Sequence, residues 1–491
     1  MNDPHDPHES STALAYLSAR ELMHRLESGA VTSVDLVETH LARIEAIDAP
    51  SSDIALNSVA AMSGDALDVA RERDQERSGG VVRGPLHGVA ILIKDNIEAI
   101  GLPGLAGSTA LIGRTTRDAP LVTRLRDAGA IVLGSTNLSQ WANIRSSRST
   151  SGYSASGGLV GNPWALDRSA GGSSSGSGAA LAAGLAPLAV GTETDGSIVC
   201  PASVNGVVGL KPTVGQVPAT YVVPISASQD SPGPMGRNVD DVALLYGVLS
   251  ARKAPEKVAQ PTFAVATNWR TGNPETDELF DGFVALLRAA SLRVIERELA
   301  LPGDEEFADE GVVLYSELFD DLGEYLRARP GEGVKSLADV IAYEDEHRLI
   351  EQAFFGHDLF LRSVQTGGRA GDAYAISRRR NLSWAVDTCL TPALEGVDVV
   401  IAPAYGPSWK SDLAVGGHPG PSSPATMAPA IAGWPIMSVP MGLVQGLPVG
   451  LAIMGRANSE WTILEAGRIA ERIVAENGPV PRPLWKRPSR G

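Results

Sequence analysis

Residues 191–212 read GTETDGSIVCPASVNGVVGLKP, and a second stretch of small residues, GGSSSGSG at 171–178, stands shortly before them. Both stretches are rich in Ser and Gly, and both lie between apolar runs. Neither contains a His, and none of the eight His residues is near them in the sequence. A nucleophilic serine in either stretch would therefore need a residue other than His to take its proton.

Lys94 is the candidate for that base. It ends the apolar run of HGVAILIKDN (87–96), which has the pattern of a buried strand. Most lysines at a strand end lie on the surface, but burial would favour the neutral form of the amine. Because a neutral amine can act as a general base, the sequence predicts this role for Lys94 if the lysine meets the serines in space.

Other motifs fit the two Ser/Gly stretches poorly. GGSSSGSG lacks the Gly-Lys-Ser/Thr ending of a phosphate-binding loop, and GSGAAL lacks the third Gly of a dinucleotide fingerprint. A G-x-S-x-G elbow can be placed on 172–176, but it would require a downstream His. His347 and His357 fit better as surface residues on charged helices, and the context of His418 does not favour catalysis either.

The composition is that of a large globular protein. The 491 residues are 43% hydrophobic and 20% charged, which suffices for a large core. The net charge of −16 argues against nucleic acid or an anionic membrane as a partner. Two cysteines, with no Cys/His spacing typical of metal sites, lead us to expect no disulfide framework, metal or cofactor. No signal-peptide pattern or bilayer-length apolar run is visible, so we expect a cytoplasmic protein.

Strand and helix patterns alternate in the first half of the chain, which predicts an α/β fold. Two helices are expected within 14–48, with Thr32 as a cap between them. Further helices are expected at 59–77, 119–129 and 179–186, and strands at 87–96 and 130–134. The Gly/Ser-rich segment 143–178 has the composition of a linker, but its apolar flanks favour an ordered loop.

The remaining sequence predicts one domain rather than two. The section 253–395 is charged and helix-like, whereas strand patterns return at 397–404, 435–442 and 447–455 and precede a helix at 459–475. We therefore expect a single domain over 1–491. Its parts are an N-terminal part with the catalytic core (14–250), a variable helical section (253–395) and C-terminal strands and helix that complete the core (396–475).

Three blocks carry a family resemblance: HGVAILIKDNIEAIGLPGLAGS (87–108), GGSSSGSGAALAAG (171–184) and GTETDGSIVCPASVNGVVGLKPT (191–213). In this order they resemble the successive blocks of the amidase signature family. The resemblance extends over most of the chain and ends in GLPVGLAIMGR (446–456). It implies an amidase with a large mixed central β-sheet covered by helices on both faces.

The resemblance also implies a catalytic triad. By motif, the lysine is Lys94, the bridging serine is Ser173, with a cis peptide bond in the family, and the nucleophile is Ser197. The implied oxyanion hole consists of backbone N–H groups of Thr194, Asp195, Gly196 and Ser197. Asp195 stands where the family commonly has Gly; its N–H group is retained, but an ionised side chain must point away from the developing negative charge.

The segments TETDGSIVCP and STSGYSASGG are similar to the peptide-amidase branch, which releases ammonia from C-terminal amides. Ser149, Tyr153 and Gly172 are the candidates for substrate contact. Anilides, esters and carbamates (urethanes) remain alternative substrates, because an activated serine can attack any of these acyl groups. Two different roles also stay open, that of an A-type subunit of a glutamyl-tRNA amidotransferase and that of a noncatalytic binding scaffold. We expect a small-molecule substrate, and a monomer or homodimer.

Overall fold

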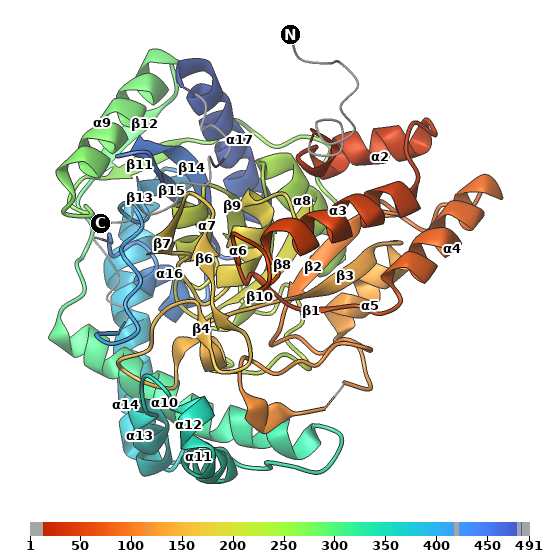
Figure 1. The fold of residues 1–491 in the computed structure, drawn as a ribbon. Coiled ribbons are helices and arrows are strands. Elements are labelled where there is room, and N and C mark those ends of the chain that lie inside the picture. Colours follow the sequence, from red (N-terminus) through yellow and green to blue (C-terminus); the bar gives the residue numbers. More distant parts are fainter. Residues whose placement is uncertain (1–12, 114, 417–421, 479–482, 484–491) are drawn as a thin grey trace.

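The computed structural model describes residues 13–113, 115–416, 422–478 and 483, and Figure 1 shows their arrangement. An eleven-stranded mixed sheet runs through the molecule in the order β1-β3-β2-β8-β10-β9-β14-β15-β13-β11-β12. Its strands are β1 Val59–Met62, β2 Ala90–Lys94, β3 Ile131–Thr136, β8 Leu188–Glu193, β9 Val208–Lys211, β10 Ser231–Gly236, β11 Phe263–Ala266, β12 Val294–Arg297, β13 Val399–Pro403, β14 Ile436–Val444 and β15 Leu447–Gly455. Two small hairpins pair β4 Tyr153–Ser154 with β5 Gly158–Leu159, and β6 Gly161–Asn162 with β7 Ala165–Ser169.

Helices lie on both faces of this sheet, which confirms the predicted fold class. The described helices, which include some that lie away from the sheet, are α2 Ala19–Glu27, α3 Ser33–Ile47, α4 Ala66–Ser78, α5 Pro120–Asp127, α6 Ser175–Ala182, α7 Val199–Asn205, α8 Val239–Ser250, α9 Pro274–Ala289, α10 Asp304–Ala328, α11 Leu337–Glu346, α12 Arg348–Glu351, α13 Asp358–Thr366, α14 Asp372–Leu382, α15 Thr391–Ala393, α16 Met427–Ala432 and α17 Glu460–Asn477. Shorter helical turns cover Thr109–Leu111 and Gln140–Asn143, and Ser383–Leu390 forms a π-helical segment.

The N-terminal half follows the predicted alternation with two errors, one of which is that the helix predicted at 179–186 spans Ser175–Ala182 and leaves 183–186 non-helical. Thr32 caps α3 as expected, because its side chain accepts a hydrogen bond from the backbone of Asp35 and the Asp35 carboxylate accepts one in return. The predicted helix at 59–77 is wrong over its first part: 59–62 forms β1, which pairs antiparallel with β3. A run as short as VAAM has no decisive periodicity, and the open edge of β3 provides the pairing that the sequence does not reveal.

The section 253–395 contains two strands that the sequence analysis missed. Strands β11 and β12 pair in parallel with each other, and β11 also pairs in parallel with β13, so they extend the main sheet. Each has only four residues and stands beside a long helix, which explains why the helical pattern dominated. The section also contains helices α9 to α15, whereas 253–262 forms neither helix nor strand, and Figure 1 shows α10 to α14 gathered at one end of the molecule.

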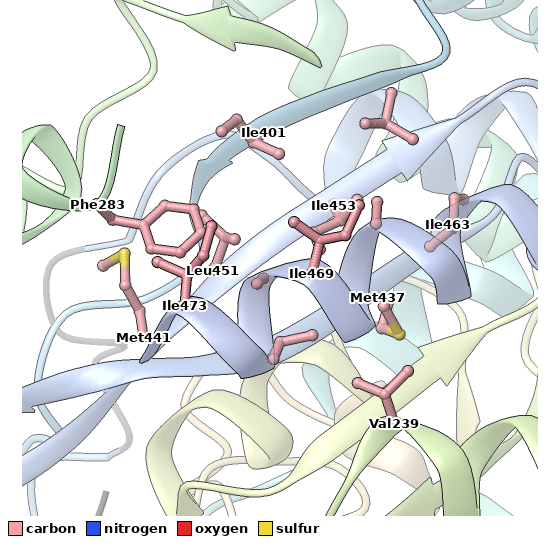
Figure 2. Close-up of a cluster of buried hydrophobic side chains, with 14 of the residues drawn as sticks. Val239, Phe283, Ile401, Met437, Met441, Leu451, Ile453, Ile463, Ile469 and Ile473 are labelled. Atoms are coloured by element: carbon pink, nitrogen blue, oxygen red, sulfur yellow. The ribbon is translucent and has the colours of Figure 1, made fainter. Parts of the chain in front are cut away.

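The C-terminal strands β13, β14 and β15 and helix α17 contribute to one hydrophobic cluster. Ile463, Ile469 and Ile473 of α17 are buried against the β14–β15 hairpin, where they meet residues such as Met437 and Leu451 (Figure 2). Burial of such side chains stabilises the fold by about 1.5–3 kcal/mol each. The same cluster includes Val208 and Leu210 of β9, so it reaches the end of the second Ser/Gly stretch.

Gly176, in the first turn of α6, lets that helix touch the neighbouring backbone. A Cβ atom at this position would lie 2.2 Å from the carbonyl oxygen of Ser58 and 2.5 Å from that of Asn137. Gly176→Ala is therefore expected to lower the free energy of unfolding by about 2–3 kcal/mol, measured by denaturant titration. The control Gly282→Ala meets no atom within 4 Å on α9; it should stabilise slightly, because Ala has the higher helix propensity. Equal effects of the two substitutions would contradict this explanation.

Candidate active site

The first part of the site is the carboxyl edge of three parallel strands. β2 lies between β3 and β8 and runs parallel to both, so the ends of the three strands meet at one edge of the sheet. Lys94 is the last residue of β2, and Thr192 stands near the end of β8. Ligands of open α/β sheets commonly bind outside this edge.

Lys94 is fully buried at this edge. Its Nζ lies 2.8 Å from Oγ of Ser173, and 3.2 Å and 2.9 Å from the carbonyl oxygen and Oγ1 of Thr192. Burial lowers the pKa of Lys94 to about 7, while the negative charges of Asp230 and Glu193 act in the opposite direction. A substantial fraction of this amine is therefore neutral at neutral pH.

Ser173 precedes α6 and is also buried. The peptide bond between Gly172 and Ser173 is cis, as the family resemblance implies. The backbone N–H of Ser139 donates to the carbonyl oxygen of Ser173 at 3.1 Å, which fixes the segment on the core. The next residue, Ser174, donates its N–H to the carbonyl oxygen of Ser197 at 3.1 Å. The two Ser/Gly stretches of the sequence are thus adjacent in space.

Ser197 ends the loop that joins β8 to α7. Within the described part of the chain, no acceptor takes a hydrogen bond from the backbone N–H groups of Asp195, Gly196 and Ser197. The following two N–H groups are satisfied, because Ile198 and Val199 donate to the Glu193 carboxylate at 2.6 Å and 2.8 Å. The loop thus presents unpaired donors beside Ser197, as an oxyanion hole requires.

Charged side chains surround this loop. Desolvation raises the pKa of the Asp195 carboxyl group, whereas Thr426 and the cation of Lys211 lower it. Burial and the nearby Asp195 charge raise the pKa of Glu310 to about 8, so Glu310 is largely protonated at neutral pH. Lys211 is fully buried, and burial lowers its pKa to about 8 against the nearby carboxylates. Lys211 thus supplies positive charge on the Asp195 side of the loop.

A cavity of about 260 Å³ opens over Ser197. Its lining combines the 194–197 loop and Gly172 with residues from distant parts of the chain: Ala142, Asn143, Ile144, Ser151, Cys200, Ile225, Leu314, Tyr405 and Trp409. A second cavity of about 230 Å³ shares Ala142, Thr194 and Ile225 with the first. It is lined mainly by apolar residues of the segment 214–232, together with Asn96, Thr192 and Asp230.

The predicted substrate-contact residues lie in different places. Gly172 lines the cavity over Ser197. Ser149 is buried, and its hydroxyl group has no partner among the described residues. Tyr153 packs its ring edge-on against Phe354 and Phe355 at centroid distances of 5.0 Å and 5.7 Å. Substrate contact stays a prediction for all three residues.

Sequence reasoning missed several residues of the site. Asp230 accepts a hydrogen bond from Thr194 Oγ1 at 2.5 Å and two more from the backbone of Ile225 and Ser226. It thereby connects the loop beside Ser197 to the wall of the second cavity. Thr192 lies inside the quoted motif and could have been found from its position on a strand that ends at the site. Asp230, Tyr405 and Trp409 gave no such signal, because only the folded chain brings them to the cavity.

No described histidine lines the cavity over Ser197. The prediction that His357 is an ordinary surface residue is wrong: it is buried, and its Nδ1 lies 2.9 Å from Oε2 of Glu344. His347 is half-buried and stacks on Tyr343. His418 lies outside the described residues. Over the described ranges, no three His, Cys, Asp or Glu side chains are grouped so as to hold a metal ion, and no described helix has the length and apolarity needed to cross a bilayer.

Comparison with known proteins gives a consistent result. The family model Amidase matches residues 35–464. A solved peptide amidase from Stenotrophomonas maltophilia is 38% identical, with a TM-score of 0.87 over 96% of this chain and 98% of that chain. The A subunit of the glutamyl-tRNA(Gln) amidotransferase of Streptomyces coelicolor is 32% identical over 94% of this chain and 96% of its own length. A Schizosaccharomyces pombe protein provisionally named an amidase is 30% identical over 92% and 84%.

The family model spans most of the chain, and the peptide amidase aligns with nearly all of it. These matches confirm the family and the enzyme class that the three motif blocks predict. The chain therefore belongs to the amidase family and is an amidase that acts on carbon–nitrogen bonds.

Proposed function

We propose that this amidase hydrolyses the C-terminal amide of peptides, or similar small amides, through an acyl-enzyme on Ser197. The observation that carries the proposal is the contact of 2.8 Å between the fully buried Lys94 amine and the Ser173 hydroxyl, next to a cavity lined by Ser197. The peptide amidase with 38% identity over most of both chains supports this choice of substrate.

The contacts of Lys94 fit a neutral amine. A neutral amine has two N–H bonds and one lone pair, and both oxygens of Thr192 within reach of Nζ can accept a hydrogen bond. Thr192 Oγ1 also accepts a hydrogen bond from Asn96 at 3.0 Å, which fixes its orientation. With both N–H bonds directed to Thr192, the lone pair is left to accept the O–H of Ser173.

Acylation follows from this arrangement. Ser197 Oγ attacks the amide carbon while Ser173 Oγ takes the Ser197 proton and passes its own proton to Lys94. The negative charge that develops on the carbonyl oxygen is stabilised by N–H groups of the Thr194–Ser197 loop. The C–N bond then breaks, the relay returns the proton to the leaving nitrogen, and ammonia departs. Water attacks the resulting ester by the reverse relay, which releases the carboxylic acid and restores Ser197.

A second candidate function is a role within an amidotransferase, and it is favoured by 32% identity to the amidotransferase chain over nearly the whole length. The two candidates differ in what the isolated protein should do. A hydrolase needs no partner, whereas an amidotransferase passes ammonia on to a second protein chain.

The expected result is that the purified chain alone releases ammonia from N-acetyl-L-alaninamide. Its kcat/KM for this primary amide should exceed that for L-glutamine by at least about a hundredfold if the substrate is of the peptide type, as the similarity to the peptide amidase supports. Ammonia release is measured with a coupled assay, and the matched p-nitroanilide and methyl ester test the alternative leaving groups. A clear preference for glutamine, or for the anilide or ester over the amide, would overturn the substrate assignment.

A further inference from the structure

The backbone in one wall of the cavity has an unusual conformation. Three consecutive residues, Trp141, Ala142 and Asn143, have φ angles of 51°, 51° and 78°. Non-glycine residues rarely adopt this left-handed region, although Asn tolerates it better than most. Ala142 and Asn143 both line the cavity over Ser197. The chain therefore holds a costly conformation in the wall of the cavity over Ser197.

Trp141 fixes this segment to the helical section. Its backbone N–H donates to the carbonyl oxygen of Ala106 at 2.8 Å, and its indole N–H donates to the buried Glu344 at 3.0 Å. Its ring also packs edge-on against Phe360 at a centroid distance of 5.8 Å. With Trp141 held by three contacts, Asn143 has little freedom to leave the cavity wall.

The side chain of Asn143 lacks an internal partner where one would be expected. Its carbonyl oxygen is buried and accepts no hydrogen bond from any described residue. A buried polar atom without a partner is costly unless a ligand or water satisfies it. A carbonyl oxygen can be satisfied only by a donor, and an amide side chain pairs best with another amide, which offers N–H and C=O together.

We propose that Asn143 recognises the peptide bond that precedes the scissile amide, and so selects N-acylated amino-acid amides over simple acyl amides. In this arrangement the Asn143 carbonyl oxygen accepts the N–H of that peptide bond. The inference rests on the proposed function, since it names the part of the substrate that the site recognises. It makes Asn143 a specificity-determining residue without a part in the proton relay.

The test compares two substrates that differ in one group. N-acetyl-L-alaninamide carries the N–H, and O-acetyl-L-lactamide replaces it by an ester oxygen while keeping the same primary amide. Wild-type kcat/KM, followed by ammonia release, should be at least about tenfold higher for the substrate with the N–H, because its absence leaves a buried acceptor unpaired. Asn143→Gly, which suits the left-handed backbone, should bring the ratio close to one by losing activity on the N–H substrate alone.

Two further variants separate recognition from disturbance of the backbone. Asn143→Asp keeps an acceptor oxygen and should retain a preference for the N–H substrate. Ala142→Gly loosens the same left-handed segment but keeps the Asn143 amide, so its ratio should equal that of the wild type. Thermal unfolding confirms that each variant is folded.

The inference is overturned if the wild-type ratio is close to one, if Asn143→Gly keeps the wild-type ratio, or if Asn143→Gly loses activity equally on both substrates. Equal loss would mean that Asn143 contacts the scissile amide or only supports the fold. In each of these cases the proposed hydrolysis still stands, because the wild-type enzyme still turns over both substrates. If the wild type releases ammonia from neither substrate, the proposed function fails and the inference fails with it.

Discussion

Ser197→Ala is expected to lower the rate of ammonia release by about five orders of magnitude while the protein remains folded. The loss is this large because the proposed reaction forms a covalent bond to Ser197 Oγ, and the methyl group of alanine cannot form it. Stabilisation of the oxyanion by the N–H groups of the loop would remain and would account for any residual rate over the uncatalysed reaction. The measurement is single-turnover and steady-state ammonia release from N-acetyl-L-alaninamide.

Ser438→Ala is a matched control for Ser197→Ala. Ser438 is equally a small buried serine, but it lies in β14, and its hydroxyl group has no partner among the described residues. Its replacement should leave turnover within about twofold of the wild type, because buried hydroxyl groups away from a site affect stability rather than chemistry. Near-wild-type activity of folded Ser197→Ala would refute the assignment of the nucleophile.

A covalent probe gives an independent readout of the same prediction. A sulfonyl fluoride or a phosphonate should add its mass to the tryptic peptide that contains Ser197, and the label should be absent from Ser197→Ala. Labelling of Ser173 in the wild type would mean that Ser173, and not Ser197, is the nucleophile. Labelling of a serine outside the site would contradict the mechanism as a whole.

The sequence predicts the centre of the site better than its walls. Lys94 ends a run that has the local pattern of a buried strand, whereas the roles of Ser173 and Ser197 are implied by the family resemblance of the motifs that contain them. Both kinds of signal lie within short stretches of sequence, the range over which periodicity and motifs are readable. The strand order that brings Lys94 beside Thr192 is visible only in the structure, because the sequence analysis predicted no strand at β8 and missed Thr192.

The walls depend on contacts between segments that are far apart in the sequence. Tyr405 and Trp409 reach the cavity from the loop after β13, and Leu314 reaches it from α10. None of these residues has a local pattern that differs from ordinary packing. The left-handed backbone at Asn143 is likewise invisible in the sequence, because Glu344, more than two hundred residues further on, holds the preceding tryptophan. Substrate specificity is therefore the property that most needs the folded chain.

Lys94→Met is expected to lower kcat by about three to four orders of magnitude, because it removes the general base but fills most of the same buried space. The wild-type pH profile should carry the signature of this base. Since burial lowers the pKa of Lys94 to about 7, kcat/KM should fall about tenfold per pH unit below pH 7 and level off above it, where the amine is neutral. The residual activity of Lys94→Met should lack this limb.

Lys211 is the necessary comparison, because burial also lowers its pKa, to about 8. Its Nζ donates to the carbonyl oxygens of Trp434 and Pro429 at 3.1 Å and 3.5 Å and contacts neither serine. If Lys94 is the base, Lys211→Met should retain a limb close to pH 7, even if its stability is lower. If the fall in activity below pH 7 survives in Lys94→Met but disappears in Lys211→Met, the titrating group is Lys211. That result would refute the proposed relay.

The pH dependence of the free energy of unfolding reports the protonation of Lys94 independently of catalysis. In the unfolded chain Lys94 titrates near 10.5, and in the folded chain it titrates near 7, so between these values the unfolded state binds more protons. The contribution of Lys94 to the free energy of unfolding must therefore increase with pH from about 7 to 10.5 and be constant outside this window. Denaturant titrations across this range should show a smaller increase for Lys94→Met than for the wild type. Equal slopes would mean that the folded protein keeps Lys94 protonated, and an ammonium group has no lone pair with which to accept the proton of Ser173.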